Sequence, residues 1–295
     1  ASPVTVAASL TLKARAYPSN GWAPSTVTSA TYTLNYGTLA APSASPAGAI
    51  YPAAQSVTLS ADAGATIRYT TDGSTPTALS ALYSAPLTIA AASSTLKAVA
   101  SKPDWTASGV MSESYVIDLV PPFNDAAVYP SPINGWNHSA VAVTFHCSDN
   151  VGLASCPAPV TQIDETSGVV ISGTAIDLAG HQTVSGATIR LDRTPPVVTL
   201  TAPLDGTTVT GASVSVTATA TDALSGIVTA TCNGVAAAVA GDAVTCTVPL
   251  LNGRNAVVVH VQDAAGNTAP RGASITRVGT TTQLILAPSL RTMLV

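Results

Sequence analysis

An internal repeat is the feature that most constrains the fold of this chain. Residues 12–34, which begin Leu-Lys-Ala, recur as residues 96–117, and Trp22 is matched by Trp105. The offset is 84 residues at the start and 83 at the tryptophans, so one residue is inserted. Such repetition predicts an array of similar small domains. Only the second half of the first copy is present before residue 39, so we expect a partial domain there.

Short alternating segments between turn residues predict β-strands along the whole chain. Only 9% of the residues are charged, against about 25% in an average soluble domain, and the helix-favouring Glu and Lys are scarce. Strands of about four to eight residues, spaced about 8–12 residues apart, are typical of a β-sandwich. No stretch has the pattern of a long amphipathic helix. The clearest alternating segments are 56–60, 66–70, 141–145, 214–217 and 256–261.

Proline pairs mark the predicted domain boundaries. Asp118–Pro122 and Asp192–Pro196 share the form Asp-x-x-Pro-Pro, and proline favours extended backbone at itself and at the residue before it. We therefore expect short semi-rigid linkers that hold all-β sandwich domains end to end as a rod. The predicted map is a partial sandwich at 1–39, whole domains at 40–118, 119–192 and 193–278, and a linker with the first strand of a further domain at 279–295.

Four cysteines form two close pairs in the sequence. Cys147 and Cys156 lie in one predicted domain, and Cys232 and Cys246 lie in the next. An even cysteine count, low charge and all-β patterning favour disulfides in an oxidising, extracytoplasmic compartment. A zinc site with four cysteine ligands and free thiols are the alternatives, and the absence of a Cys-x-x-Cys pair argues against zinc.

The segment 40–118 carries the motifs of a known module. Residues 69–76 read Tyr-Thr-Thr-Asp-Gly-Ser-Thr-Pro, preceded by the matching stretches 45–51 and 55–59. This segment resembles the chitobiase/β-hexosaminidase C-terminal domain, a fibronectin-like or Ig-like bacterial module, and residues 9–34 are similar to its second half. The resemblance implies tandem Ig-like or fibronectin-like β-sandwiches.

The later domains resemble bacterial Ig-like modules. Asp177–His181 and Asp263–Asn267 are similar to the Asp-x-Ala-Gly-Asn turn near the last strands of those modules, and Pro203–Val209 to their opening hairpin. The domain at 193–278 is also similar to a β-sandwich accessory domain of a glucodextranase. In these families the modules accompany a glycosidase, an adhesin tip or a cell-wall anchor, and a shared fold does not supply that other activity.

Charge and hydropathy restrict the partners and the location. A net charge of −4, with three lysines and eight arginines spread thinly, argues against a nucleic-acid partner. Apolar runs stop well short of about 18 residues, so no membrane span is expected. No basic and apolar leader opens the chain, so we expect a leader to be removed or to lie outside this segment. We predict an extracellular or cell-surface location in a bacterium.

The sequence contains no recognisable catalytic constellation. Glu165 directly follows Asp164 in a predicted loop, whereas glycosidase carboxylates face each other across a cleft, about 5–9.5 Å apart. Gly-x-Ser-x-Gly, His-Glu-x-x-His and phosphate-binding glycine motifs are missing. The histidines are scattered, and His260 lies in a predicted strand. We therefore predict a protein without catalytic residues or an organic cofactor.

Aspartate turns are candidate calcium ligands. Asp149 and Asp222 occupy like positions in successive domains, and together with Asp177 and Asp263 they would place carboxylates at domain ends. Calcium takes about six to eight oxygen ligands, and rod-like adhesins use it to stiffen linkers. The simpler interpretation, which we favour, is that these side chains cap turns by accepting hydrogen bonds from their own backbone.

Two functions fit these patterns. The first is a non-catalytic structural segment, such as a stalk, spacer or filament element, of a bacterial secreted or surface protein. The alternative is a carbohydrate-associated accessory region of a glycoside hydrolase or adhesin, with Trp22, Trp105 and Trp136 as sugar-stacking candidates. Repeat-equivalent tryptophans are more often core anchors, and we favour that interpretation. The expected partners are other protein domains, copies of this chain, or cell-wall or extracellular polysaccharide.

The two ends of the chain lead to one further hypothesis. Residues 1–39 would expose strand edges and half a core, and residues 283–295 have the pattern of an unpaired strand. Strand exchange between these segments in neighbouring copies would make a head-to-tail polymer. The simpler interpretation, which we prefer, is that both ends are cut from a longer chain.

Overall fold

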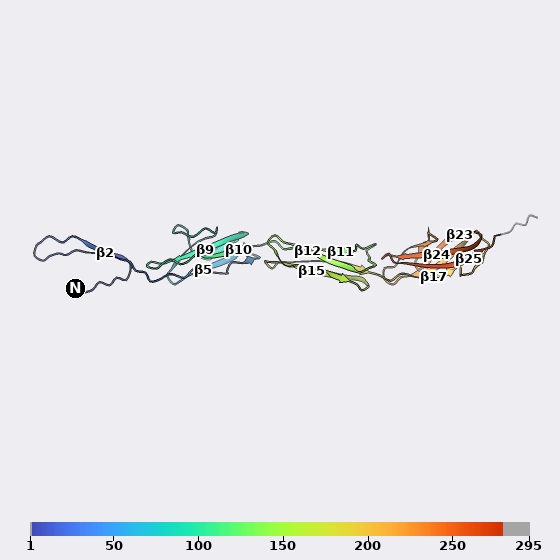
Figure 1. Ribbon diagram of the computed structural model, residues 1–295, viewed down its shortest axis with the longest axis horizontal. Helices are drawn as coiled ribbons and strands as arrows, with labels where there is room; N and C mark the ends of the chain where they lie inside the picture. The colour runs from blue at the N-terminus through green and yellow to red at the C-terminus, as the bar shows by residue number, and fades with distance from the viewer. Residues whose placement is uncertain (1, 280–295) are drawn as a thin grey trace, which may run out of the picture. The chain divides into compact units, whose positions relative to one another are not determined.

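The computed structural model describes residues 2–279, in which all regular structure is β-strand (Figure 1). The all-β prediction is therefore confirmed. Within this range the strands form seven sheets. None of the described residues belongs to a helix of the length and hydropathy needed to cross a membrane. The strand predicted at 283–295 lies outside the described residues.

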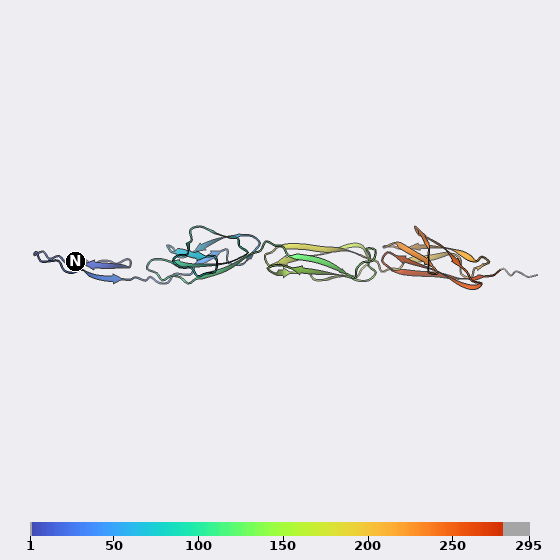
Figure 2. The same cartoon turned by 90° about the horizontal axis from the view of Figure 1, so that it is seen from above.

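The first element is a hairpin of two antiparallel strands, β1 (Leu10–Ala14) and β2 (Thr28–Tyr32). Its residues are exposed, apart from Leu12, which is partly buried. Figures 1 and 2 show the two strands without a second sheet across them. The hairpin therefore has the pairing of a sheet but no core of its own.

The first sandwich (43–117) consists of a five-stranded sheet, β4-β10-β9-β6-β7, and a three-stranded sheet, β3-β5-β8. Its core receives Val57 from β5 and Leu96 from β9, both with no exposed surface. Inward residues alternate along each strand because successive side chains of a strand point to opposite faces. The strands are β3 (Ser43–Ser45), β4 (Ile50–Tyr51), β5 (Gln55–Ser60), β6 (Thr66–Thr70), β7 (Ala81–Leu82), β8 (Leu87–Ile89), β9 (Ser93–Ser101) and β10 (Met111–Ile117).

A buried tyrosine closes one end of this core. Tyr115 has no exposed surface, and its hydroxyl donates a hydrogen bond to the carbonyl oxygen of Pro46 at 2.7 Å. Burial raises the pKa of Tyr115 to about 12, and the neighbouring Glu113 and Tyr51 act in the same direction. The side chain therefore stays neutral at ordinary pH and keeps its hydrogen bond.

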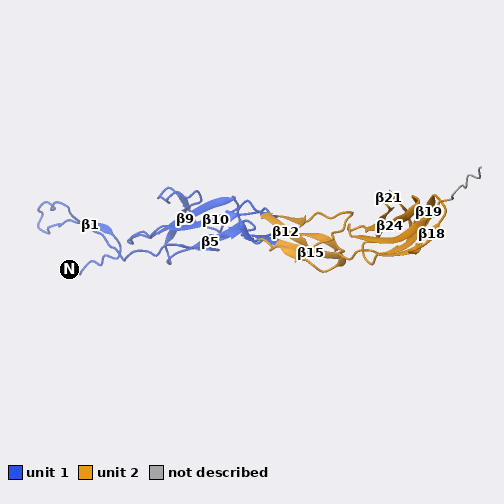
Figure 3. Ribbon diagram, turned by 45° about the vertical axis from the view of Figure 1, so that its right-hand side comes forward, with its two compact units in different colours: residues 1–123, 148–155, 175–183 blue, residues 124–147, 156–174, 184–295 orange. Residues whose placement is uncertain are grey.

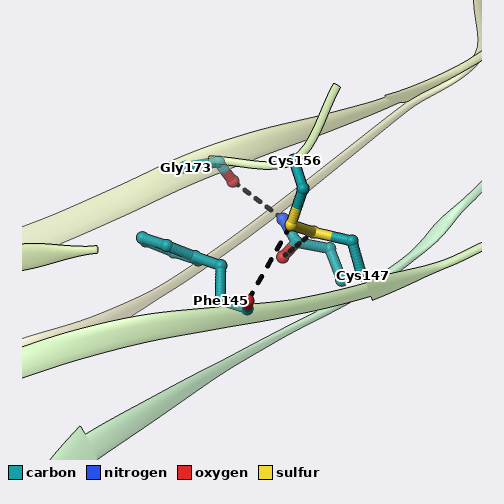
Figure 4. Close-up of a disulfide and its surroundings, with 5 residues drawn as sticks. Phe145, Cys147, Cys156 and Gly173 are labelled. Carbon is teal, nitrogen blue, oxygen red and sulfur yellow. Dashed lines mark hydrogen bonds between the residues drawn. A yellow bond between two sulfur atoms is a disulfide. The ribbon is translucent and has the colours of Figure 1, made fainter. Parts of the chain in front are cut away.

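The second sandwich (123–191) pairs the sheets β11-β12-β14 and β13-β15-β16. Val143 and Phe145 on β12 pack with Ile171 and Ile189 of the facing sheet. A disulfide joins Cys147 to Cys156 beside Phe145 (Figure 4). The strands are β11 (Phe123–Tyr129), β12 (Val141–Ser148), β13 (Leu153–Ser155), β14 (Val160–Gln162), β15 (Thr166–Asp177) and β16 (Gln182–Leu191).

The third sandwich (197–277) pairs the sheets β17-β19-β23-β22 and β18-β25-β24-β20-β21. Its core is rich in valine and alanine, and a second disulfide links Cys232 on β20 to Cys246 on β23 across the two sheets. Both disulfides have the predicted partners. The strands are β17 (Val197–Ala202), β18 (Thr208–Val209), β19 (Ser213–Thr221), β20 (Ile227–Cys232), β21 (Val235–Ala236), β22 (Ala238–Ala240), β23 (Ala243–Pro249), β24 (Gly253–Asp263) and β25 (Thr268–Arg277).

The chain divides into two compact units (Figure 3). The second sandwich contributes residues to both, so the predicted domain boundaries stay a prediction. Unit 1 comprises residues 1–123, 148–155 and 175–183, and unit 2 comprises residues 124–147, 156–174 and 184–295.

Candidate functional site at the linker aspartates

The first group of candidate residues surrounds the linker after β10, within unit 1. Asp118 follows that strand directly and is only 1% exposed. Its Oδ1 accepts hydrogen bonds from the backbone nitrogen of Val120 (3.1 Å) and from Nδ2 of Asn150 (3.3 Å). Its Oδ2 is buried and has no hydrogen-bond partner among the described residues. Leaving a buried polar atom unpaired costs about 1–3 kcal/mol, and more when the group is charged.

Asp149 has a similar unpaired oxygen. It follows β12, and its Oδ2 accepts hydrogen bonds from the backbone nitrogens of Val151 (2.8 Å) and Gly152 (2.9 Å). Its Oδ1 is buried without a hydrogen-bond partner in the described part of the chain. Two carboxylates of unit 1 thus each direct one oxygen to the protein backbone and leave the other unpaired.

Asp177 and His181 lie close to Asp118. It ends β15, and its Oδ1 accepts a hydrogen bond from the backbone nitrogen of His181 (2.8 Å), while its Oδ2 lies 2.8 Å from Nδ1 of the same residue. Burial alone would raise the pKa of Asp177, but these hydrogen bonds outweigh burial and lower the pKa below its ordinary value. Asp118, Asp177 and His181 each offer a ligand atom, and these atoms lie within 4.8 Å of one another.

A second group of carboxylates lies in unit 2. Ligand atoms of Asp192, Asp222 and Asp263 lie within 4.8 Å of one another. Asp192, with no exposed surface, accepts hydrogen bonds from the backbone nitrogens of Thr194 and Ser225, both at 3.1 Å. Asp222 and Asp263 accept hydrogen bonds from backbone nitrogens of their own turns, at 2.8–3.0 Å. No oxygen of these three carboxylates is among the buried unpaired atoms of the described residues.

Sequence reasoning found four of these aspartates and missed two. The four candidates Asp149, Asp177, Asp222 and Asp263 all accept hydrogen bonds from turn backbone, as the capping interpretation requires. The structure adds Asp118 and Asp192 to the groups. In the sequence these two aspartates indicated only the positions of linkers. Their signal was the shared Asp-x-x-Pro-Pro motif, since each Asp accepts a hydrogen bond from the backbone two residues later. Calcium binding by the four candidates stays a prediction.

The interpretation of the repeat-equivalent tryptophans as core anchors is wrong. The side chain of Trp22 is 75% exposed. Trp105 is partly buried, outside the core of the first sandwich, with its ring centroid 6.1 Å from that of Tyr36 and 5.4 Å from Nζ of Lys102. Both tryptophans lie in connections that follow a strand rather than in the strands that build the core. Trp136 is partly buried in the loop after β11.

Glu165, one of the two carboxylates considered for catalysis, contacts a linker. Oε1 of Glu165 accepts hydrogen bonds from the backbone nitrogen of Arg193 and the hydroxyl of Thr194, both at 2.8 Å. Glu165 therefore holds the linker that follows β16. His260 occupies an ordinary exposed position on β24, paired across the sheet with Thr231.

Comparisons with known proteins agree with the motifs of two sandwiches. Residues 46–112 match the family model of the chitobiase/β-hexosaminidase C-terminal domain. Residues 196–278 match that of glucodextranase domain B. Both resemblances expected from the sequence are thereby confirmed. We call these segments the chitobiase-type module and the glucodextranase-B-type module. No curated protein sequence matches the chain.

Solved structures similar to this chain are tandem β-sandwich proteins. The fibronectin(III)-like modules of CbhA from Clostridium thermocellum align at 14% identity over 55% of this chain and 100% of theirs, with a TM-score of 0.34. A tetra-tandem repeat in the extending region of a large adhesion protein aligns at 17% identity over 90% and 81%, with a TM-score of 0.34. A bacterial ice-binding adhesin aligns at 16% identity over 77% and 91%, with a TM-score of 0.29.

Proposed function

We propose that this chain is a non-catalytic spacer or stalk segment of a bacterial secreted or surface protein. The observation that carries the proposal is the buried aspartate in each linker. A carboxylate is costly to bury unless hydrogen bonds compensate for the lost water. Asp118 and Asp192 are nonetheless almost completely buried, at 1% and 0% exposed. A buried aspartate in each linker supports a role in which the linkers are held in a fixed conformation, as a spacer or stalk requires.

The contacts of the second linker support this role in detail. Oδ2 of Asp192 accepts a hydrogen bond from the backbone nitrogen of Ser225, and the backbone carbonyl oxygen of Asp192 accepts one from Nδ2 of Asn267 (3.0 Å). From the preceding sandwich, Nδ1 of His138 lies 3.1 Å from the carbonyl oxygen of Ala265. Several independent polar contacts thus tie this linker to the glucodextranase-B-type module, and a spacer needs such ties to resist bending.

Small-angle X-ray scattering tests the spacer proposal. The double variant Asp192→Ala with Asn267→Ala removes linker hydrogen bonds. It should broaden the distance distribution of the chain, because the linker then samples more orientations. Asp242→Ala, at an exposed turn of the same module, is the matched control and should leave the distribution unchanged. An identical profile for the double variant and the wild type would contradict the proposal.

A carbohydrate-associated accessory role is the second candidate, and one observation favours it. The indole of Trp22 is 75% exposed on the connection between β1 and β2, and exposed aromatic faces suit stacking on sugars. The match of two segments to accessory domains of carbohydrate enzymes supports the same role. Pulldown with cell-wall polysaccharide separates the candidates. Retention that Trp22→Ala abolishes supports the accessory role, and no retention of the wild type argues against it.

We also propose that Asp118 and Asp177 bind a divalent cation, with calcium as the first choice, and that the nearby turn of Asp149 is a second candidate ligand. Oδ2 of Asp118 and Oδ1 of Asp149 are buried and unpaired, and hard carboxylate oxygens are the ligands that calcium prefers. Among residues 2–279 the one ion pair joins His181 to Asp177, so no lysine or arginine neutralises the other two carboxylates. A cation bound at Asp118 would give its Oδ2 the partner that the described residues do not supply.

Thermal unfolding with and without calcium tests the cation proposal. At a free calcium concentration ten times the Kd, binding to the folded state should stabilise it by about 1.4 kcal/mol. Asp118→Asn keeps the shape of the side chain and its Oδ1 acceptor but removes the charge, and it should abolish most of the shift. Asp242→Asn is the control that should retain it. The proposal fails if millimolar calcium leaves the melting temperature of the wild type unchanged.

A further inference from the structure

The loop 148–155 of the second sandwich contacts the linker that precedes this sandwich. Nδ2 of Asn150 in this loop donates a hydrogen bond to Oδ1 of the linker residue Asp118 at 3.3 Å. The carbonyl oxygen of Gly152 accepts a hydrogen bond at 2.9 Å from the backbone nitrogen of Leu178, which follows β15. The position of this loop therefore decides whether Asp118 keeps the amide donor of Asn150.

The third sandwich has an equivalent loop beside its own linker. The backbone nitrogen of Ser225 in that loop donates a hydrogen bond to Oδ2 of Asp192 at 3.1 Å. The carbonyl oxygen of Gly226 accepts a hydrogen bond from the backbone nitrogen of Ala264 at 2.9 Å. Both contacts correspond to those of the loop 148–155. The two linkers are therefore held by loops of the same kind.

The two loops are anchored differently. After Gly226 the chain continues as β20, a strand of six residues whose register with β24 extends from Ile227 to Cys232. After Gly152 the chain continues as β13, which has three residues and is followed directly by Cys156. The disulfide from Cys156 to Cys147 closes the base of this loop. The disulfide thus anchors the loop 148–155 where a longer strand anchors its counterpart.

The two disulfides of the chain differ in exposure. Cys156 is exposed, and Cys147 near the end of β12 is half-buried (Figure 4). Cys232 is only 1% exposed, and its partner Cys246 packs against the core of the third sandwich. A disulfide is broken when a thiolate attacks one of its sulfurs, so the rate depends on access to that sulfur. The disulfide beside the first linker is therefore the accessible one.

We propose that the disulfide between Cys147 and Cys156 is a thiol-exchange site through which a dithiol reductant loosens the first linker. This inference rests on the proposed spacer role, which makes the stiffness of a linker important. A thiolate of the dithiol attacks Sγ of Cys156, the bond to Cys147 breaks, and Cys147 leaves as a thiolate that takes a proton from water. The second thiol then attacks the reductant's own sulfur in the mixed disulfide and releases Cys156. Both cysteines end as thiols, and the dithiol is oxidised to its disulfide with the transfer of two electrons.

Reduction should loosen one linker and not the other. Opening the ring returns to the loop 148–155 the backbone freedom that the cross-link removes. Asn150 then spends less time within hydrogen-bonding distance of Asp118. At the second linker, the loop that contacts Asp192 is anchored by β20 and keeps its position. The redox state of one exposed disulfide thereby sets the stiffness of one linker.

Mild reduction of the folded full chain tests the exchange site. Dithiothreitol is the probe, iodoacetamide traps the free thiols, and mass spectrometry locates the label. Cys147 and Cys156 should be labelled at least about tenfold faster than Cys232 and Cys246, because attack requires an accessible sulfur. Equal rates of labelling for the two pairs would overturn the assignment.

Hydrogen exchange on the selectively reduced chain tests the loosening of the linker. The amides of residues 118–122 and 148–155 should exchange at least about fivefold faster, because local opening becomes easier. The amides of residues 192–196 belong to the linker without such a disulfide and should exchange at their original rates. Unchanged exchange in 118–122 and 148–155 after reduction refutes the proposal.

Two pairs of substitutions serve as a reagent-free version of this experiment. Cys147→Ser with Cys156→Ser should reproduce the faster exchange of the first linker without dithiothreitol. Cys232→Ala with Cys246→Ala is the matched control, which removes the other disulfide and should leave the first linker unchanged. If the first pair prevents folding of the second sandwich, the reduced wild-type chain supplies the deciding measurement. Equal effects of both pairs on the first linker would contradict a specific role of the exposed disulfide.

X-ray scattering separates this inference from the spacer proposal. Selective reduction should broaden the distance distribution of the full chain, and reoxidation should restore it. Asp192→Ala with Asn267→Ala loosens the second linker without any reductant. Broadening by this double variant but not by reduction refutes the redox inference alone. Broadening by neither refutes the spacer proposal, and the redox inference with it.

Discussion

Truncation of one repeat-equivalent leucine should destabilise a sandwich, whereas truncation of the other should have almost no effect. Leu96 has no exposed surface and lies in the core of the first sandwich. Leu96→Ala should therefore cost about 3 kcal/mol, within the range of about 2–5 kcal/mol for buried leucines. Leu12 occupies the same repeat position on a hairpin without a covering layer. Leu12→Ala should change stability by at most about 0.5 kcal/mol, as for other surface substitutions.

Hydrogen exchange across a thermal series separates these effects by segment. In a module of this size, about 3 kcal/mol corresponds to a fall in melting temperature of roughly 12–24 °C. Leu96→Ala should show this fall for the peptides that span 55–117, with the third sandwich as an internal reference. Equal destabilisation by the two substitutions would refute the reasoning, because it would mean that the hairpin face is already buried in the free chain.

Three further substitutions probe backbone packing, cross-linking and titration. Gly48→Ala should destabilise the first sandwich by about 1–3 kcal/mol in urea titrations, because its Cβ would lie 2.5 Å from a backbone oxygen of β10; Gly109→Ala, with open space around it, should not. Replacing Cys232 and Cys246 by alanine should lower the free energy of unfolding of the third sandwich by about 3 kcal/mol. An unchanged free energy of unfolding would contradict this prediction. The raised pKa of Tyr115 favours the neutral phenol in the folded state, so stability should be full below pH about 10 and fall as the pH rises toward 12. Tyr115→Phe should remove this alkaline loss, as circular dichroism against pH would show.

Local pattern predicted most of the fold. Alternation at period two identified strands such as Gln55–Ser60 and Val141–Ser148, because each strand buries one face and exposes the other. The cysteine pairing was also predictable, since each pair lies within one sandwich. Motifs of the chitobiase-type module agreed with the family match. These features depend on residues close together in the sequence.

The linker groups were only partly predictable. Asp149 and Asp222 were recognised from their turn motifs, but Asp118 and Asp192 came from the ends of preceding strands, far away in the sequence. Whether their carboxylates lie close to those of Asp177 and Asp263 depends on tertiary packing, because Asp177 and Asp263 end strands that come much later in the sequence. The unpaired oxygens of Asp118 and Asp149 are likewise a property of packing, and no sequence pattern distinguishes them from the paired oxygens of Asp192.

The amino-acid sequence by itself determined an all-β chain with a repeated module, two disulfides and aspartate-capped turns, because strand alternation and turn chemistry act over a few residues. Only the tertiary structure decided which of the repeated residues are buried. Leu12 and Leu96 have the same local sequence and the same cross-strand register, yet one is partly exposed and the other is fully buried. The physical reason is that burial depends on a second sheet, and the described chain supplies that sheet to the second copy alone.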